Sequence, residues 1–120
     1  MPKLLFVTVN TPEVLNKEGK VRFPGSEVAL QRLSDAGWDV TVVDPLWPKP
    51  LEEAKANAYD AILVSTYKAV PRSRDAASML ARMQDAPVYT VGVLQKDEAF
   101  RTMAPEVGVL KGLKELPKPE

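Results

Sequence analysis

The chain has 120 residues, the length of one ordinary domain, and its 45% apolar and 27% charged residues are the balance of a globular protein rather than a disordered one. Sixteen basic residues match sixteen acidic ones, so no net charge attracts nucleic acid or an anionic membrane. The absence of cysteine and histidine excludes disulfides, thiolate nucleophiles and every Ser-His or Cys-His mechanism.

Four short apolar runs predict β-strands, and they are β-branched and nearly continuous rather than alternating. Continuous runs are typical of parallel strands that helices cover on both faces. The predicted strands are Leu4–Val9, Val40–Val43, Ala61–Val64 and Val88–Val91.

Helical patterns lie between these strands, over Ser26–Ala36, Leu51–Ala58 and Ser73–Gln84. We expect the first helix to stop at Gly37 and the third to begin with Ser73 as its N-cap. Weaker signals follow in the last third of the chain. They predict a short helix over Lys96–Met103, a fifth strand over Val107–Leu110 and a last turn or helix over Lys111–Leu116.

The alternation of strands and helices predicts an α/β fold in three αβα layers around a flavodoxin-like parallel sheet of about five strands. One domain over residues 1–116 and a tail over residues 117–120 account for the whole chain, with no repeat and no linker. Proline, with 11 residues, is roughly twice as frequent as usual and falls mostly between the periodic segments, a thermophile-like composition. Without a signal peptide or an apolar run that spans a bilayer, we expect a cytoplasmic protein with no membrane contact.

The connection from Asn10 to Gly25 is out of proportion, because its sixteen residues exceed the two to six that are usual for such a loop. It follows the first strand, and open α/β sheets bind ligands at the carboxyl ends of their strands. Long loops in compact domains are typically functional or mobile.

A candidate anion site combines this connection with the loop after the third strand. Lys68, Arg72 and Arg74 put three positive charges into seven residues, and Gly25-Ser26 opens a helix whose free amides favour an anion. The full candidate set is Asn10, Thr11, Gly25, Ser26, Ser65, Thr66, Lys68, Arg72 and Arg74. The glycine-rich fingerprint of dinucleotide and P-loop sites is absent. The alternative is that the cations form a solvated loop and Gly25-Ser26 is a plain helix cap.

Four aspartates stand beside predicted strands or a helix end: Asp35, Asp39, Asp44 and Asp60. We interpret them as turn residues that bond their own backbone. Asp44 ends the second strand, where dinucleotide folds place a carboxylate on a ribose hydroxyl, but without the fingerprint we favour a turn there too. The sequence therefore predicts no catalytic residue, no metal site and no cofactor.

The two tryptophans have different expected roles. Trp38 precedes a strand and is expected at the edge of the core. Trp47 lies between prolines beside Leu46, and an exposed pair of this kind would suit an anchor for a protein partner. The alternative is that Trp47 folds back over the edge of the sheet.

Several segments resemble the receiver domain of bacterial response regulators. They are Thr11–Leu15 after the first strand, Ala58–Val64 at the third and Ala86–Val91 at the fourth, with Gly108–Leu113 and Lys118-Pro119 near the end. Where that family has acidic residues this chain has Asn10 and Thr11, Ser65 matches the phospho-acceptor position, and Gly92 matches the switch residue. The resemblance therefore implies a degenerate, pseudo-receiver-like module without phosphorylation chemistry.

A second resemblance is to the N-terminal half of GT-B glycosyltransferases, carried by Lys3–Pro12 and Ala36–Val43. It covers only the first half of the chain well, and the half of such an enzyme that binds the nucleotide sugar has no counterpart in this sequence. The resemblance implies a module like the N-terminal domain of these enzymes. A third, to cobalamin-binding-like domains, lacks the histidine that would ligate cobalt.

Two hypotheses for the function follow. The first is a non-enzymatic regulatory or interaction module that works through a protein partner or self-association. The second is a small-molecule module that binds an anionic nucleotide or sugar phosphate at the carboxyl edge of the sheet. The missing histidine, cysteine and acidic cluster favour the first and argue against an enzyme. The long connection and the Lys68–Arg74 cations favour the second.

Overall fold

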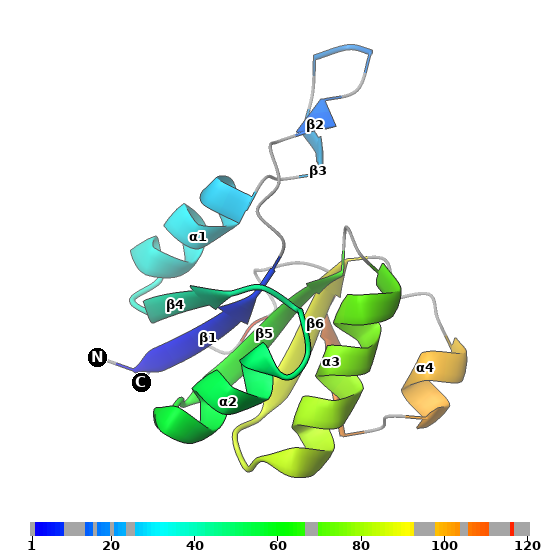
Figure 1. The fold of residues 1–120 in the computed structure, drawn as a ribbon. Coiled ribbons are helices and arrows are strands. Elements are labelled where there is room, and N and C mark those ends of the chain that lie inside the picture. Colours follow the sequence, from blue (N-terminus) through cyan, green and yellow to red (C-terminus); the bar gives the residue numbers. More distant parts are fainter. Residues whose placement is uncertain are drawn as a thin grey trace.

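The computed structural model describes residues 2–8, 14–15, 17–19, 21–23, 26–66, 70–92, 98–103, 106–110 and 116. Its centre is a five-stranded parallel sheet in the order β4-β1-β5-β6-β7 (Figure 1). The strands are β1 Lys3–Val7, β4 Asp39–Val43, β5 Ala61–Thr66, β6 Val88–Gly92 and β7 Gly108–Leu110. Counted along the chain, this is the 2-1-3-4-5 order of flavodoxin-like folds, so the predicted fold class is confirmed.

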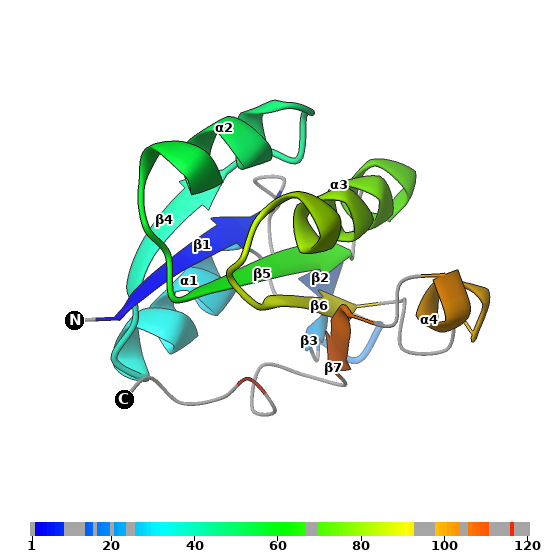
Figure 2. The same cartoon turned by 90° about the horizontal axis from the view of Figure 1, so that it is seen from below.

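Helices cover both faces of the sheet and complete the three layers. Helix α1, Ser26–Asp35, lies on one face, and α2, Lys49–Ala56, and α3, Val70–Met83, lie on the other (Figure 2). Successive residues of β1 enter opposite layers: Leu4 and Phe6 pack with α1, whereas Leu5 and Val7 belong to the cluster that includes α3. This double burial is why β1, β5 and β6 read as continuous apolar runs. The same expectation was wrong for Val40–Val43, because β4 is the last strand of the sheet and has no fully buried residue.

The end of α1 shows how a local signal sets a boundary. Gly37 has a φ of 104°, a conformation that side-chain-bearing residues rarely adopt. Its N–H donates to the Ser34 carbonyl at 3.0 Å, and the Trp38 N–H donates to the Leu33 carbonyl at 3.2 Å. These two bonds form a Schellman motif, and both Leu33 and Trp38 are buried in the cluster beside α1. The predicted stop at Gly37 and the core position of Trp38 are confirmed.

The long connection after β1 contains structure that the sequence analysis missed. Strand β2, Val14–Leu15, pairs antiparallel with β3, Val21–Phe23, and Gly19 between them has a φ of 77°. Describing this connection as a loop throughout was therefore wrong. Strands of two and three residues are too short to show a period of two, so only their pairing reveals them. Figure 1 shows this hairpin beyond the carboxyl ends of the sheet strands.

Helix α3 begins three residues earlier than predicted, at Val70, which corrects the assignment of Ser73 as its N-cap. Pro71 explains the earlier start, because proline is favoured in the first helical turn, where no amide partner is needed. Ser73 and Asp75 consequently lie inside the helix, and the first turn contains no acidic residue.

The remaining elements follow the predictions closely. Helix α2 carries Pro50 in its first turn, and α4, Glu98–Met103, and β7 confirm the two weaker signals. The last predicted turn, at residues 111–116, lies outside the described residues except for Leu116, which is buried in the cluster beside α1. In the described part of the chain, no helix has the length and apolarity to cross a membrane.

Candidate functional site

The carboxyl edge of the sheet is the predicted position of the anion site. Strand β1 lies between β4 and β5 in the sheet. The helix that follows β1 along the chain, α1, lies on one face of the sheet, and the helix that follows β5, α3, lies on the opposite face. Both helices begin at this edge (Figure 1). The switch point expected between the first and third strands of the sheet is therefore present.

The candidate residues are only partly visible at this edge. Ser26 is the first residue of α1, Thr66 is the last of β5, and Arg72 lies in the first turn of α3, each placed by its backbone. Ser65 and Arg74 are half-buried. Asn10, Thr11, Gly25 and Lys68 lie outside the described residues.

The sheet separates the two candidates whose side chains are described. Ser65 follows Leu63 by two residues, and Leu63 packs in the cluster beside α1, so Ser65 belongs to that face. Arg74 lies on α3, whose Ala77 and Leu80 pack on the opposite face. A ligand that contacts both residues would have to lie across the edge of the sheet.

The Arg74 side chain contains a buried donor atom without an acceptor in the described part of the chain. Its Nε atom is buried and has no hydrogen-bond partner among the residues that the structure describes. Arg74 lies in the second turn of α3, and the first turn of that helix contains no acidic residue. A buried donor without an acceptor costs free energy, and an anion at this position would remove that cost.

Thr90 is a polar residue at the centre of the sheet that the sequence analysis did not select. It is fully buried in β6, and its Oγ1 atom has no partner in the described part of the chain. The available signal was one threonine inside the apolar run Val88–Val91. Threonine is common in strands, so this signal by itself did not indicate a site.

Two of the four aspartates, Asp44 and Asp35, accept local hydrogen bonds. Asp44 Oδ1 accepts a 3.0 Å bond from the Leu46 N–H, which confirms the turn predicted there. Asp35 accepts a 2.8 Å bond from the Gln31 side chain, so it bonds a neighbouring side chain of its own helix rather than its own backbone. Within the described ranges, no group of three or more carboxylates is placed to hold a metal ion.

The outer edge of β4, the terminal strand of the sheet in the described part of the chain, is the second candidate site. Asp39 donates its N–H to Pro2 and Val43 accepts from the Thr8 N–H, so these residues direct their backbone groups toward β1. By alternation, Val40 and Val42 direct theirs toward the open edge. Val42 is 48% exposed and Leu46 is 45% exposed. Trp47, the other predicted anchor, is half-buried and packs against the cluster beside α3.

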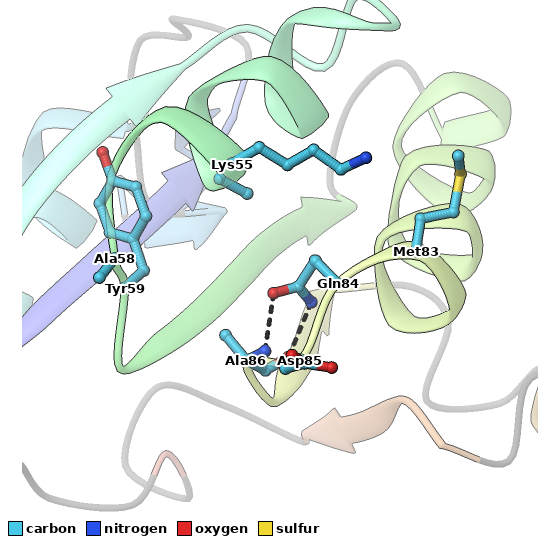
Figure 3. Close-up of a pocket in the computed structure, with 8 residues that line it drawn as sticks. Lys55, Ala58, Tyr59, Met83, Gln84, Asp85 and Ala86 are labelled. Atoms are coloured by element: carbon cyan, nitrogen blue, oxygen red, sulfur yellow. Dashed lines mark hydrogen bonds between the residues drawn. The ribbon is translucent and has the colours of Figure 1, made fainter.

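A groove of about 390 Å³ lies at the opposite, amino-terminal edge, between α2 and the turn that follows α3 (Figure 3). Its lining residues include Lys55, Tyr59, Met83, Gln84 and Asp85. The Gln84 side-chain amide donates to the Leu80 and Ala86 carbonyls and accepts from the Ala86 N–H, so it stabilises the turn.

Tyr59, on one wall of this groove, makes a structural contact. Its Oη donates a 2.6 Å hydrogen bond to Glu53 Oε1, which also accepts from the Asn57 side chain. Burial raises the pKa of the Tyr59 hydroxyl above its ordinary value, and the bond to Glu53 raises it further. These bonds join the end of α2 to the segment before β5, so the Tyr59 hydroxyl serves the packing of these two segments.

Comparison of the chain with protein-family models, with curated proteins and with solved structures finds no significant match.

Proposed function

We propose that this chain is a non-enzymatic module that binds an anionic nucleotide or sugar phosphate at the carboxyl edge of its sheet. The observation that carries the proposal is the buried Arg74 Nε without a described partner. Arg74 supplies the cation, and the start of α3 adds its free amides and the positive end of its dipole. With no histidine or cysteine in the chain, the proposal assigns binding and no bond-breaking step.

The expected affinity is modest. Each charge-assisted hydrogen bond from Arg74 contributes about 1.5–3 kcal/mol. Ordering of the ligand and of the residues around it offsets part of this gain, so we expect dissociation constants between about 1 μM and 1 mM.

Calorimetric titration with adenosine 5′-monophosphate, UDP and glucose 6-phosphate tests the proposal. Arg74→Gln should weaken binding about tenfold or more. Arg82→Gln is the matched control, because Arg82 lies on the same helix at the opposite edge, paired with Glu106 at 3.6 Å. No binding by the natural sequence, or equal affinity in the Arg74 and Arg82 variants, would contradict the proposal.

A second candidate function is self-association through the open edge of β4, in keeping with the pseudo-receiver-like interaction module that the sequence suggests. The observation that favours it is the exposure of Val42 in β4 and of Leu46 just after it, since β4 itself contains neither the lysine nor the proline that commonly protects edges. Two copies would pair their β4 strands antiparallel, with Val40 opposite Val42 of the second copy.

Sedimentation equilibrium tests this candidate. The natural sequence should form dimers at high concentration, and Val42→Lys should shift the chain to monomer. Met83→Lys is the control, because Met83 is equally exposed but lies at the end of α3, away from β4. A monomeric natural sequence at millimolar concentration would exclude the dimer.

A further inference from the structure

The groove at the amino-terminal edge of the sheet is lined by two side chains of opposite charge. Lys55 lies in the last turn of α2 and Asp85 lies in the turn that follows α3. Figure 3 shows Lys55 extending from α2 toward the side of α3. Both residues are exposed, and neither side chain makes a hydrogen bond or an ion pair within the described part of the chain. Two opposite charges are therefore available to a ligand in one groove.

The other polar side chains that line this groove are already satisfied. The Tyr59 hydroxyl donates a 2.6 Å hydrogen bond to a carboxylate of α2. The Gln84 amide uses both of its N–H groups and its oxygen in bonds of 2.7–2.9 Å to backbone atoms of α3 and of the turn. Of the lining side chains, Lys55 and Asp85 thus offer the charged groups that a ligand can bind.

The rest of the lining is apolar and consists of Ala54, Ala58, Met83 and Ala86. Ala54, Ala86 and Tyr59 also pack against the cluster beside α3, so this part of the lining is continuous with the core. The groove volume of about 390 Å³ is within the usual range of small-molecule sites. A ligand with an apolar middle would remove this surface from water.

The two charges select the class of ligand. A simple anion would be attracted by Lys55 but repelled by Asp85, and a simple cation would meet the reverse. A zwitterion is attracted by both. Since Lys55 and Asp85 form no ion pair with each other, a ligand whose charges are held apart by a spacer fits them better than one whose charges are adjacent.

We propose that this groove binds a free dipeptide with apolar side chains. Its terminal carboxylate contacts the Lys55 ammonium group, its terminal ammonium group contacts the Asp85 carboxylate, and its side chains cover the alanines between them. Both termini of the peptide are used, so a longer chain would not fit between the two charges. The groove lies at the opposite edge of the sheet from the proposed anion site, and the two sites are independent.

NMR titration of the full chain with alanyl-leucine, up to about 10 mM, tests the inference. We expect saturable shifts at the backbone amides of Ala58 and Ala86 and none at Val109 in β7. Acetylation of the amino terminus of the dipeptide, or amidation of its carboxyl terminus, removes one charge and should weaken binding about tenfold.

Charge-reversal variants of the chain complete the test. Lys55→Glu and Asp85→Lys should each weaken binding about tenfold or more, because the groove then contains two charges of the same sign. The double variant regains one charge of each sign and should bind within about threefold of the natural sequence, with the dipeptide reversed. Lys49→Glu and Asp75→Lys are the matched controls, because both residues are exposed, one on α2 and one on α3, and neither lines the groove.

The outcomes separate this inference from the proposed function. Absence of saturable shifts in the natural sequence, or equal affinity in Lys55→Glu and Lys49→Glu, would overturn the inference and leave the groove charges as solvated surface groups. A double variant that stays folded but binds no better than the single variants would also overturn it. Arg74→Gln should leave dipeptide affinity unchanged, so failure of the anion site does not affect this result.

Discussion

Asp60 and Lys3 are joined by two hydrogen bonds that connect the amino ends of β5 and β1. The Lys3 N–H donates to Asp60 Oδ2 at 2.7 Å, and the Asp60 N–H donates to the Lys3 carbonyl at 2.8 Å. The sequence analysis expected Asp60 to bond its own backbone, and this was wrong. Its side chain instead accepts from a strand 57 residues away, because parallel pairing places β1 beside β5.

Asp60→Ala should lower the free energy of unfolding by about 1–2 kcal/mol, because the Lys3 amide loses its acceptor. Asp60→Asn keeps an acceptor oxygen and should cost less. Urea denaturation measures both. Asp35→Ala is the control, since Asp35 accepts only a side-chain bond on an exposed helix face, and we expect a change within about 0.5 kcal/mol. Equal losses of unfolding free energy in Asp60→Ala and Asp35→Ala would show that the hydrogen bond to Lys3 contributes no measurable stability.

Gly108 faces Tyr89 across the pairing of β6 with β7. A Cβ atom at position 108 would lie 2.6 Å from Cδ1 and 3.0 Å from Cε1 of the Tyr89 ring. Gly108→Ala should therefore cost about 1–3 kcal/mol of stability as the ring is displaced. The same substitution in a Tyr89→Ala background should cost much less, and a double-mutant cycle measures the difference. Additive costs would contradict the contact.

Tyr59 should make stability depend on pH in the alkaline range. Burial and the bond to Glu53 raise its pKa in the folded chain, so the unfolded chain loses the tyrosine proton first. The contribution is fully present below the unfolded value of about 10 and is lost as pH rises through the folded pKa. Tyr59→Phe should remove this part of the pH dependence. Denaturation of both chains from pH 8 to 12 provides the comparison, and parallel curves would contradict the assignment.

Leu80 and Met83 lie on the same helix but differ in burial. Leu80 is fully buried in the cluster beside α3, and Met83 is 48% exposed. We expect Leu80→Ala to cost about 2–5 kcal/mol, because it removes apolar contacts and leaves a cavity. Met83→Ala should change stability by about 0.5 kcal/mol at most. Thermal and urea unfolding measure the stability of both variants. A loss of stability in Met83→Ala as large as that in Leu80→Ala would mean that the exposed Met83 side chain packs on a partner.

Local patterns in the sequence were sufficient to predict the architecture. The apolar runs at Leu4–Val7, Ala61–Val64 and Val88–Val91 are buried on both faces, as in a parallel sheet that helices cover, and helical periodicity predicted a helix after each. The right-handedness of such crossovers left few possible strand orders. Short-range signals of this kind, including the stop at Gly37, arise from the backbone and from burial, so they can be recognised without knowledge of distant contacts.

The contents of the candidate site depended on contacts between distant segments. The β2–β3 hairpin, the bond from Asp60 to Lys3 and the ring of Tyr89 over Gly108 each join residues that no local pattern relates. Arg74 was predicted as a cation, but the burial of its Nε atom without a hydrogen-bond partner in the described part of the chain became visible only in the packed structure. Whether a polar atom has a partner is decided by every neighbour that folding brings to it, and that set is a property of the tertiary structure.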